Sequence, residues 1–161
     1  MWWLLVQAAV AGPWHVGASV GGGGEFQMVS DTAPGGQLEV ALEVERDMPK
    51  ASLYLSIPVR FAFEYDTTAL LTGLHIGAVV RTGRGPVHGL VGGGGGALVG
   101  AYPAGGSLAS RAFAEGRFGV EYQPSKGPSW QLWAQPEVGG APNYNGVAPY
   151  VGMQLRTGIR F

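Results

Sequence analysis

The sequence predicts an all-β protein: a closed, antiparallel, up-and-down transmembrane β-barrel of eight strands. Three observations predict this fold. Apolar and polar residues alternate with a period of two along most of the chain, as they do in β-strands. Turn-forming sequences separate the alternating segments, and no helical period of ten or more residues occurs. The charged residues of the alternating segments share one face, and their charges nearly cancel.

Composition limits the class of protein. The chain has 161 residues, a length typical of one domain, with 29 glycines, 11 prolines, 46% hydrophobic residues and 13% charged residues. It is too apolar for an ordinary soluble domain, and its glycines interrupt any membrane helix. The absence of cysteine excludes disulfides and cysteine-bound metals. A net charge of −1 provides no basic surface for nucleic acid.

The first residues differ from the rest of the chain. Residues 1–11 are apolar and end in Ala9-Val10-Ala11, which fits the small-x-small pattern of an export cleavage site. We expect residues 1–11 to be a clipped or atypical export signal and residues 12–161 to form a single β-barrel domain.

The alternation defines each predicted strand in turn. The strands are expected over 14–22, 37–45, 51–65, 70–81, 87–101, 110–122, 130–138 and 147–161. The last is the clearest, because odd-numbered residues from Val151 to Phe161 are mostly apolar and the even-numbered ones include Arg156 and Arg160. Compact turns are predicted at 47–50, 83–86 and 124–128. The opposite connections are predicted at 23–36, 66–69, 102–108 and 139–146.

The charged residues indicate which face points outward. Thirteen fall in the predicted strands, and all occupy the less apolar face: Glu39, Glu43, Glu45, Arg60, Glu64, Arg81, Arg111, Glu115, Arg117, Glu121, Glu137, Arg156 and Arg160. Both lysines instead occupy turns. A crowded interior favours arginine, whose forked guanidinium can bind two carboxylates. We therefore predict that the charged face lines the lumen and that the apolar face contacts lipid.

Aromatic residues near the predicted strand ends support a membrane location. The set is Trp14, Tyr65, Tyr102, Tyr122, Trp130, Tyr150 and Phe161. Such residues typically form a girdle where a barrel meets the membrane interface.

The pattern resembles the small eight-stranded outer-membrane β-barrel family of Gram-negative bacteria, the OmpA/OmpX/OmpW-like group. The resemblance covers roughly residues 13–161. Its most specific part is the alternating C-terminal segment that ends in an aromatic residue, in which Met153, Leu155, Ile159 and Phe161 match the family's insertion signal. The resemblance implies a bacterial outer-membrane location and insertion by the barrel-assembly machinery.

The expected role is structural or interactive. The interior of an eight-stranded barrel is filled by side chains, so the Arg/Glu set is predicted to plug the lumen. Lipids and lipopolysaccharide are the expected partners, no nucleic acid is expected, and the chain is expected to be a monomer. One alternative is a soluble lipocalin-like barrel that binds an apolar ligand. Others are a narrow channel and a lipid-modifying outer-membrane enzyme.

Candidate catalytic and metal sites are weak. Ser110, Glu115 and either His75 or His88 are the residue types that an acyl hydrolase needs, but no local spacing connects them. The three histidines are far apart in the sequence, and Glu25 and Asp31 are too sparse for a calcium loop. We therefore predict no catalytic residues, no metal and no cofactor.

Overall fold

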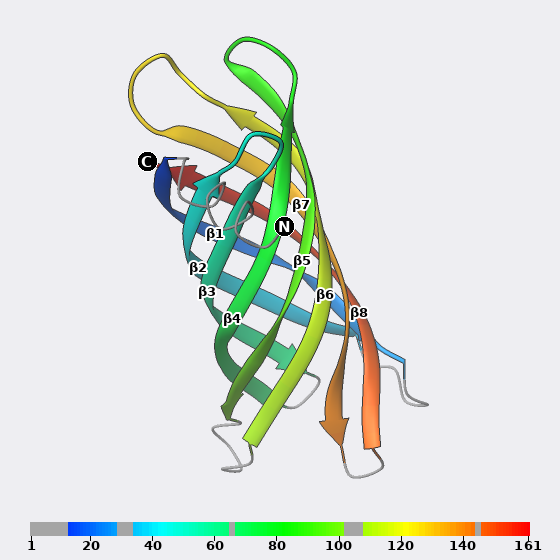
Figure 1. Ribbon diagram of the computed structural model, residues 1–161. Helices are drawn as coiled ribbons and strands as arrows, with labels where there is room; N and C mark the ends of the chain where they lie inside the picture. Colours follow the sequence, from blue (N-terminus) through cyan, green and yellow to red (C-terminus); the bar gives the residue numbers. More distant parts are fainter. Residues whose placement is uncertain (1–12, 29–33, 65–66, 102–107, 144–145) are drawn as a thin grey trace, which may run out of the picture.

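The fold is an eight-stranded antiparallel barrel closed by pairing of its first and last strands (Figure 1). It is seen in a computed structural model that describes residues 13–28, 34–64, 67–101, 108–143 and 146–161. The strands are β1 (Trp14–Gln27), β2 (Pro34–Asp47), β3 (Ser52–Glu64), β4 (Thr67–Thr82), β5 (Val87–Ala101), β6 (Leu108–Tyr122), β7 (Ser129–Asn143) and β8 (Gly146–Arg160). The predicted fold class and strand number are confirmed. The predicted export signal, residues 1–11, lies outside the described residues.

Several strands are longer than predicted. The segments 23–36 and 139–146, expected as loops, are largely strand, because β1 continues to Gln27, β2 begins at Pro34 and β7 continues to Asn143. These segments were predicted as loops because they contain several glycines. Gly23 pairs with both Gln37 and Gln154, and a Cβ at this position would collide with the carbonyl oxygen of Met153. Glycine here permits close approach of neighbouring strands and does not mark a loop.

One end of the barrel carries the connections 48–51, 83–86 and 123–128, and we call it the turn end. Gly83, Gly85 and Gly127 adopt positive φ angles there, which only glycine adopts without a steric penalty. The start of β1 and the end of β8 lie at the same end (Figure 1). The opposite end is called the loop end below.

The two faces of the barrel wall differ in chemistry. Along each strand, exposed apolar residues alternate with buried residues, many of which are charged or polar. Large hydrophobic side chains cover the outside, and Leu42 and Ile76 are 64% and 63% exposed. This orientation is the reverse of that needed by a lipocalin-like barrel with an apolar lumen. The described part of the chain contains no helix of the length and hydropathy required to span a membrane.

The predicted aromatic girdle is partly wrong. Trp14, Tyr122, Trp130 and Phe161 project outward at the turn end as expected. Tyr150 instead lies inside the barrel, only 1% exposed, because its even-numbered position in β8 faces the lumen. Tyr65 and Tyr102 lie outside the described residues.

Candidate functional site

The interior of the barrel is the candidate site, because it contains most of the charged side chains of the strands. Alternation along each strand points every second residue inward. Strands from all sides of the barrel therefore contribute to one column of polar groups, in which the ion pairs form distinct layers.

The central layer is built around Arg60 on β3. Its guanidinium donates two hydrogen bonds of 2.8 Å to the two carboxylate oxygens of Glu137 on β7. Its Nε donates a third, of 2.6 Å, to Glu39 on β2. The side chains of all three residues are fully buried. Glu39 also accepts a hydrogen bond from Arg156 on β8, so the layer connects both sides of the β1–β8 seam.

A second layer lies toward the turn end and combines an ion pair with aromatic rings. Arg117 on β6 forms a bidentate pair with Glu43, with distances of 3.0 and 2.9 Å. The same guanidinium lies 4.0 Å from the ring centroid of Tyr54 and 4.7 Å from that of Trp133. Cation–π attraction therefore adds to the ion pair in a desolvated setting.

The third layer closes the turn end. Arg81 on β4 and Arg160 on β8 share the carboxylates of Glu45 and Glu121. Asp47 lies at the edge of this cluster, 3.4 Å from Arg160 and 3.7 Å from Arg81. Each carboxylate here has two arginine partners, which offsets the cost of burying it.

The layer toward the loop end contains a residue that the sequence reasoning missed. Arg111 on β6 donates to Glu25 on β1 and lies 5.2 Å from the ring centroid of Tyr150. Glu25 was assigned to a loop because the preceding glycines suggested that β1 had ended. The alternation itself could have identified it, since Glu25 keeps the inward parity of Ser19 and Gly21.

Glu115 on β6 differs from the other interior carboxylates. It accepts hydrogen bonds of 2.6 Å from the hydroxyl of Tyr54 and from the amide of Gln135. The Nδ1 atom of His75 lies 3.6 Å from its other side. In the described part of the chain, no arginine lies within ion-pair distance of Glu115.

The structure thus brings most of the predicted charged residues into contact in the interior. Glu39, Glu137, Arg60 and Arg156 form the central layer, and the others meet in the layers above and below. Glu64 belongs to β3, but its side chain lies outside the described part of the structure.

Glycines in the wall make room for the large side chains of the interior. A Cβ added to Gly77 or Gly94 would overlap the hydroxyl end of Tyr54. Gly139 lies against the ring of Tyr150, and a Cβ at Gly119 would meet the carbonyl oxygen of Leu132 and the Cα and Cβ atoms of Trp133. The inward glycines are therefore the complement of the aromatic side chains that help to fill the lumen.

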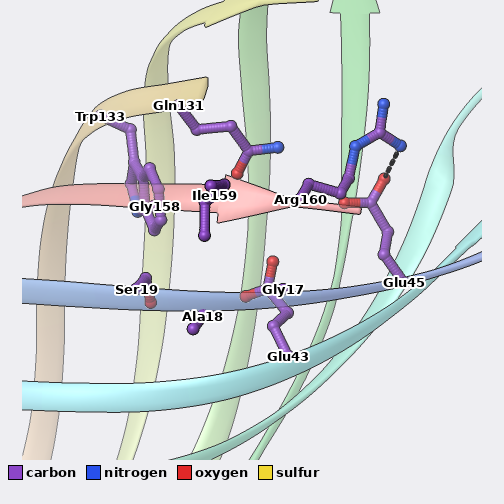
Figure 2. A pocket seen from close by; sticks show the side chains of 10 residues that line it. All are labelled: Gly17, Ala18, Ser19, Glu43, Glu45, Gln131, Trp133, Gly158, Ile159 and Arg160. Atoms are coloured by element: carbon purple, nitrogen blue, oxygen red, sulfur yellow. Dashed lines mark hydrogen bonds and ion pairs between the residues drawn. The ribbon is translucent and has the colours of Figure 1, made fainter. Parts of the chain in front are cut away.

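One small cavity lies within the part of the interior that the structure describes. This cavity of about 10 Å³ lies between the turn-end layer and Trp133 and is lined by Ser19, Glu43, Gln131 and Arg160, among others (Figure 2). Figure 2 shows the ion pair between Glu45 and Arg160 beside it. A space of this size holds about one water molecule.

The structure brings two of the candidate hydrolase residues, His75 and Glu115, together in the lumen, but Ser110 does not join them. Ser110 faces outward near the loop end of β6, whereas His75 is buried in the lumen. His88 lies near the turn end of β5, next to Glu121, and thus far along the barrel from Ser110. Within the described ranges, no cluster of three or more histidine, aspartate or glutamate side chains could hold a metal ion.

The C-terminal residues predicted as an insertion signal lie on β8 and just after it. Met153, Leu155 and Phe161 are exposed on the outer face, and Ile159 is half-buried beside Ala18 of β1. The backbone N–H of Phe161 donates to the carbonyl of Val16 at 2.9 Å, so the terminal residue is tied to β1.

Comparison with known proteins gives a structural match and no sequence match. No protein-family model and no curated protein matches the chain. The crystal structure of Neisserial surface protein A is similar, with a TM-score of 0.73 and 14% sequence identity over 91% of this chain and 95% of that one.

Two further structures are similar at lower scores. The attachment invasion locus protein Ail of Yersinia pestis has a TM-score of 0.49 and 16% identity over 91% of this chain and 98% of that one. The N-terminal β-barrel domain of Pseudomonas aeruginosa OprF has a TM-score of 0.45 and 13% identity over 90% of this chain and 97% of that one.

The match to Neisserial surface protein A covers nearly the whole of both barrels and agrees with the strand order and closure described above. The chain has the fold of the small eight-stranded outer-membrane β-barrels.

Proposed function

We propose that this protein is an integral β-barrel of the bacterial outer membrane, with a structural or surface-interaction role and a lumen plugged by its Arg/Glu network. The observation that carries the proposal is the inverted distribution of side chains. Large hydrophobic residues cover the outside of all eight strands, and paired charges fill the inside. Water would solvate the opposite arrangement, whereas lipid favours this one.

The dimensions and closure of the barrel support membrane insertion. Its strands have 13 to 16 residues, more than the roughly 9–11 that a tilted strand needs to cross the hydrocarbon core. Closure of β1 onto β8 leaves no unpaired sheet edge. Lipid requires such closure, because an unpaired backbone group has no hydrogen-bond partner there.

The interior contacts support a closed lumen. Arg60 spans from Glu39 to Glu137, and Arg117 lies between Tyr54 and Trp133 as it binds Glu43. The buried ions therefore have partners that offset their desolvation. An ion crossing the barrel would have to break several of these layers in succession.

Insertion and partners form a second part of the proposal. The outward residues Met153, Leu155 and Phe161 would present the insertion signal to the barrel-assembly machinery, with Ile159 beside them. Membrane lipids and lipopolysaccharide would surround the inserted monomer. Replacing Phe161 by Ala should slow assembly in cells more than it slows folding into pure lipid vesicles, because only the former depends on recognition. Equal effects in both assays would assign Phe161 a purely structural role.

Conductance in planar bilayers tests the proposed function. We expect the purified protein to insert, as shown by its co-flotation with vesicles, and to give no stepwise ion current. Stepwise current from inserted protein would contradict the plugged lumen. Failure to float with vesicles would contradict the membrane location.

A further inference from the structure

We propose that the outer surface where β2, β1, β8 and β7 lie side by side binds one anionic phospholipid. Arg46 would hold the phosphate, and an apolar groove would hold an acyl chain. The inference rests on the proposed membrane location and adds a specific ligand site to it. The lipid would belong to the leaflet at the turn end of the barrel.

Arg46 is an unusual residue for its position. It follows the outward-facing residues Leu42 and Val44 on β2, whereas the other charged residues that the structure describes within strands lie on the inward parity. It pairs with Trp14 in the register of β1 and β2, and its guanidinium lies 4.6 Å from the Trp14 ring centroid. Trp14 therefore fixes the cation at the turn-end rim of the apolar surface.

The guanidinium of Arg46 also lacks an anionic partner. The six interior arginines each bind at least one carboxylate, but among the described residues Arg46 forms no ion pair. Its Nε atom is buried and has no hydrogen-bond partner there. A phosphodiester at the rim would supply the missing negative charge, since guanidinium matches phosphate geometry.

An apolar groove lies on the same outer surface. It has a volume of about 300 Å³, and its outward-facing lining includes Ala18, Val20, Val40, Trp130 and Ile159. Ala18 is small and is flanked by Leu42 on one side and by Ile159 on the other. The larger side chains of Val20, Val40 and Trp130 extend beside it, so the surface is hollowed at this position.

The strand register aligns Arg46 with the groove. Moving along β1 from the Trp14–Arg46 pair, the outward pairs are Val16 with Val44, Ala18 with Leu42 and Val20 with Val40. The path is apolar throughout. Ala18 lies four positions after Trp14 in the sequence, or about 13 Å along the strand. The site for the phosphate and the groove therefore follow the order of headgroup and acyl chain in a phospholipid that lies beside the barrel.

Arg46 and the apolar groove together determine which kind of ligand fits the site. Free phosphate could bind Arg46 but would leave the apolar groove empty, and an uncharged lipid would leave Arg46 unpaired. A basic residue near the membrane surface attracts anionic lipid by about 1 kcal/mol, which corresponds to about fivefold in affinity. An anionic phospholipid satisfies both parts of the site.

Quenching of tryptophan fluorescence by a brominated lipid tests the proposal. The folded barrel in detergent micelles would be titrated with phosphatidylglycerol brominated on its acyl chains, because Trp14 contacts Arg46 and Trp130 lines the groove. We expect saturable quenching at about one lipid per barrel. R46Q should weaken the lipid affinity by about fivefold. A18F should fill the groove and also weaken binding.

Matched controls separate this site from ordinary solvation by lipid. R84Q removes an arginine from a turn, and A114F enlarges an outward alanine on β6, on another part of the barrel surface. Both should bind lipid as the unmodified protein does. Non-saturable quenching that is the same in all variants would mean annular lipid only and would overturn the proposal.

Two further measurements separate lipid binding from phosphate binding, and failure of the lipid site from failure of the proposed function. Inorganic phosphate in millimolar excess should not displace the lipid, and full displacement would assign Arg46 to free phosphate instead. Each variant must first show the slower gel mobility on heating that marks a folded barrel. Unmodified protein that lacks this shift would contradict the proposed function, whereas protein that folds and binds no lipid contradicts the lipid site alone.

Discussion

Arg60 and Glu137 face each other across the lumen, from β3 to β7, and form two parallel hydrogen bonds of 2.8 Å with no solvent exposure of either side chain. They are 77 residues apart in the sequence and lie on strands that are not neighbours in the barrel. The pair therefore ties opposite walls together, which backbone pairing between adjacent strands cannot do.

Removing Arg60 should destabilise the barrel strongly. In R60M, the buried carboxylates of Glu137 and Glu39 lose their shared partner, and breaking a buried ion pair from one side costs about 3–5 kcal/mol. Urea unfolding of the protein in detergent micelles, followed by tryptophan fluorescence, measures this change. R84M is the control, because Arg84 lies in an exposed turn. A change below about 1 kcal/mol in R60M would show that the central layer contributes little.

Glu115 should tolerate neutralisation better than Glu39. Glu115 is hydrogen-bonded to the neutral donors Tyr54 and Gln135, so an amide in its place leaves no buried charge without a partner. Gln135 can accept from that amide only by rotating its side chain, which removes the acceptor of the Trp133 Nε1–H group. We expect E115Q to lower the free energy of unfolding by about 1–2 kcal/mol, whereas E39Q should cost about 3 kcal/mol or more. The same urea titration compares the two variants. Equal losses would contradict the distinction between paired and neutral-bonded carboxylates.

Adding a single methyl group at an inward glycine should destabilise the barrel. A Cβ at Gly94 would collide with the carbonyl oxygen of Ile76, and it would contact the Tyr54 hydroxyl at 2.6 Å and the Cα of Gly77 at 2.8 Å. Such overpacking typically costs about 1–3 kcal/mol, so G94A should unfold at lower urea. G22A is the matched control, because the nearest atom to a Cβ there is the Gln37 carbonyl oxygen at 3.4 Å. A G94A barrel as stable as G22A would mean that Tyr54 and the backbone of β4 both shift at little cost.

The cost of an outward charge should depend on its height along the barrel. Ile76 lies midway along β4 and Val87 lies at the turn end of β5, and both are exposed on the outer face. In lipid vesicles, I76R should lose about 2–4 kcal/mol and V87R about 0–1 kcal/mol. Reversible unfolding from vesicles by guanidinium measures both. Equal costs at the two heights would contradict a bilayer centred on the middle of the barrel.

Much of the architecture could be predicted because successive residues of each strand face the outer surface and the lumen in turn. The two environments select apolar and polar side chains respectively. The parity of β8, with Leu155 outward and Arg156 inward, is readable directly from the sequence. The strand ends were harder, because glycine signals both loops and close strand approach. This ambiguity hid Glu25 at the end of β1. Arg46 lies beyond the predicted end of its strand for another reason, the turn sequence Asp47-Met48-Pro49-Lys50 that follows it.

The contacts inside the barrel could not be predicted from the sequence. Which carboxylate meets Arg60 depends on the stagger of all strands between β3 and β7, and each shift of two residues would offer a different partner. Tyr150 illustrates a second limit. A tyrosine near a strand end suits either a membrane interface or a lumen, and its hydrogen bond to Glu137 is visible only in three dimensions.

Gel mobility of the folded protein with and without heating tests the central claim most directly. The protein would be folded into phospholipid vesicles, dissolved in SDS without heating, and compared with a boiled sample. A detergent-stable closed barrel with an apolar exterior predicts different mobilities before and after boiling. Identical mobilities, together with a monodisperse protein in detergent-free buffer, would contradict a membrane barrel and point to a soluble one.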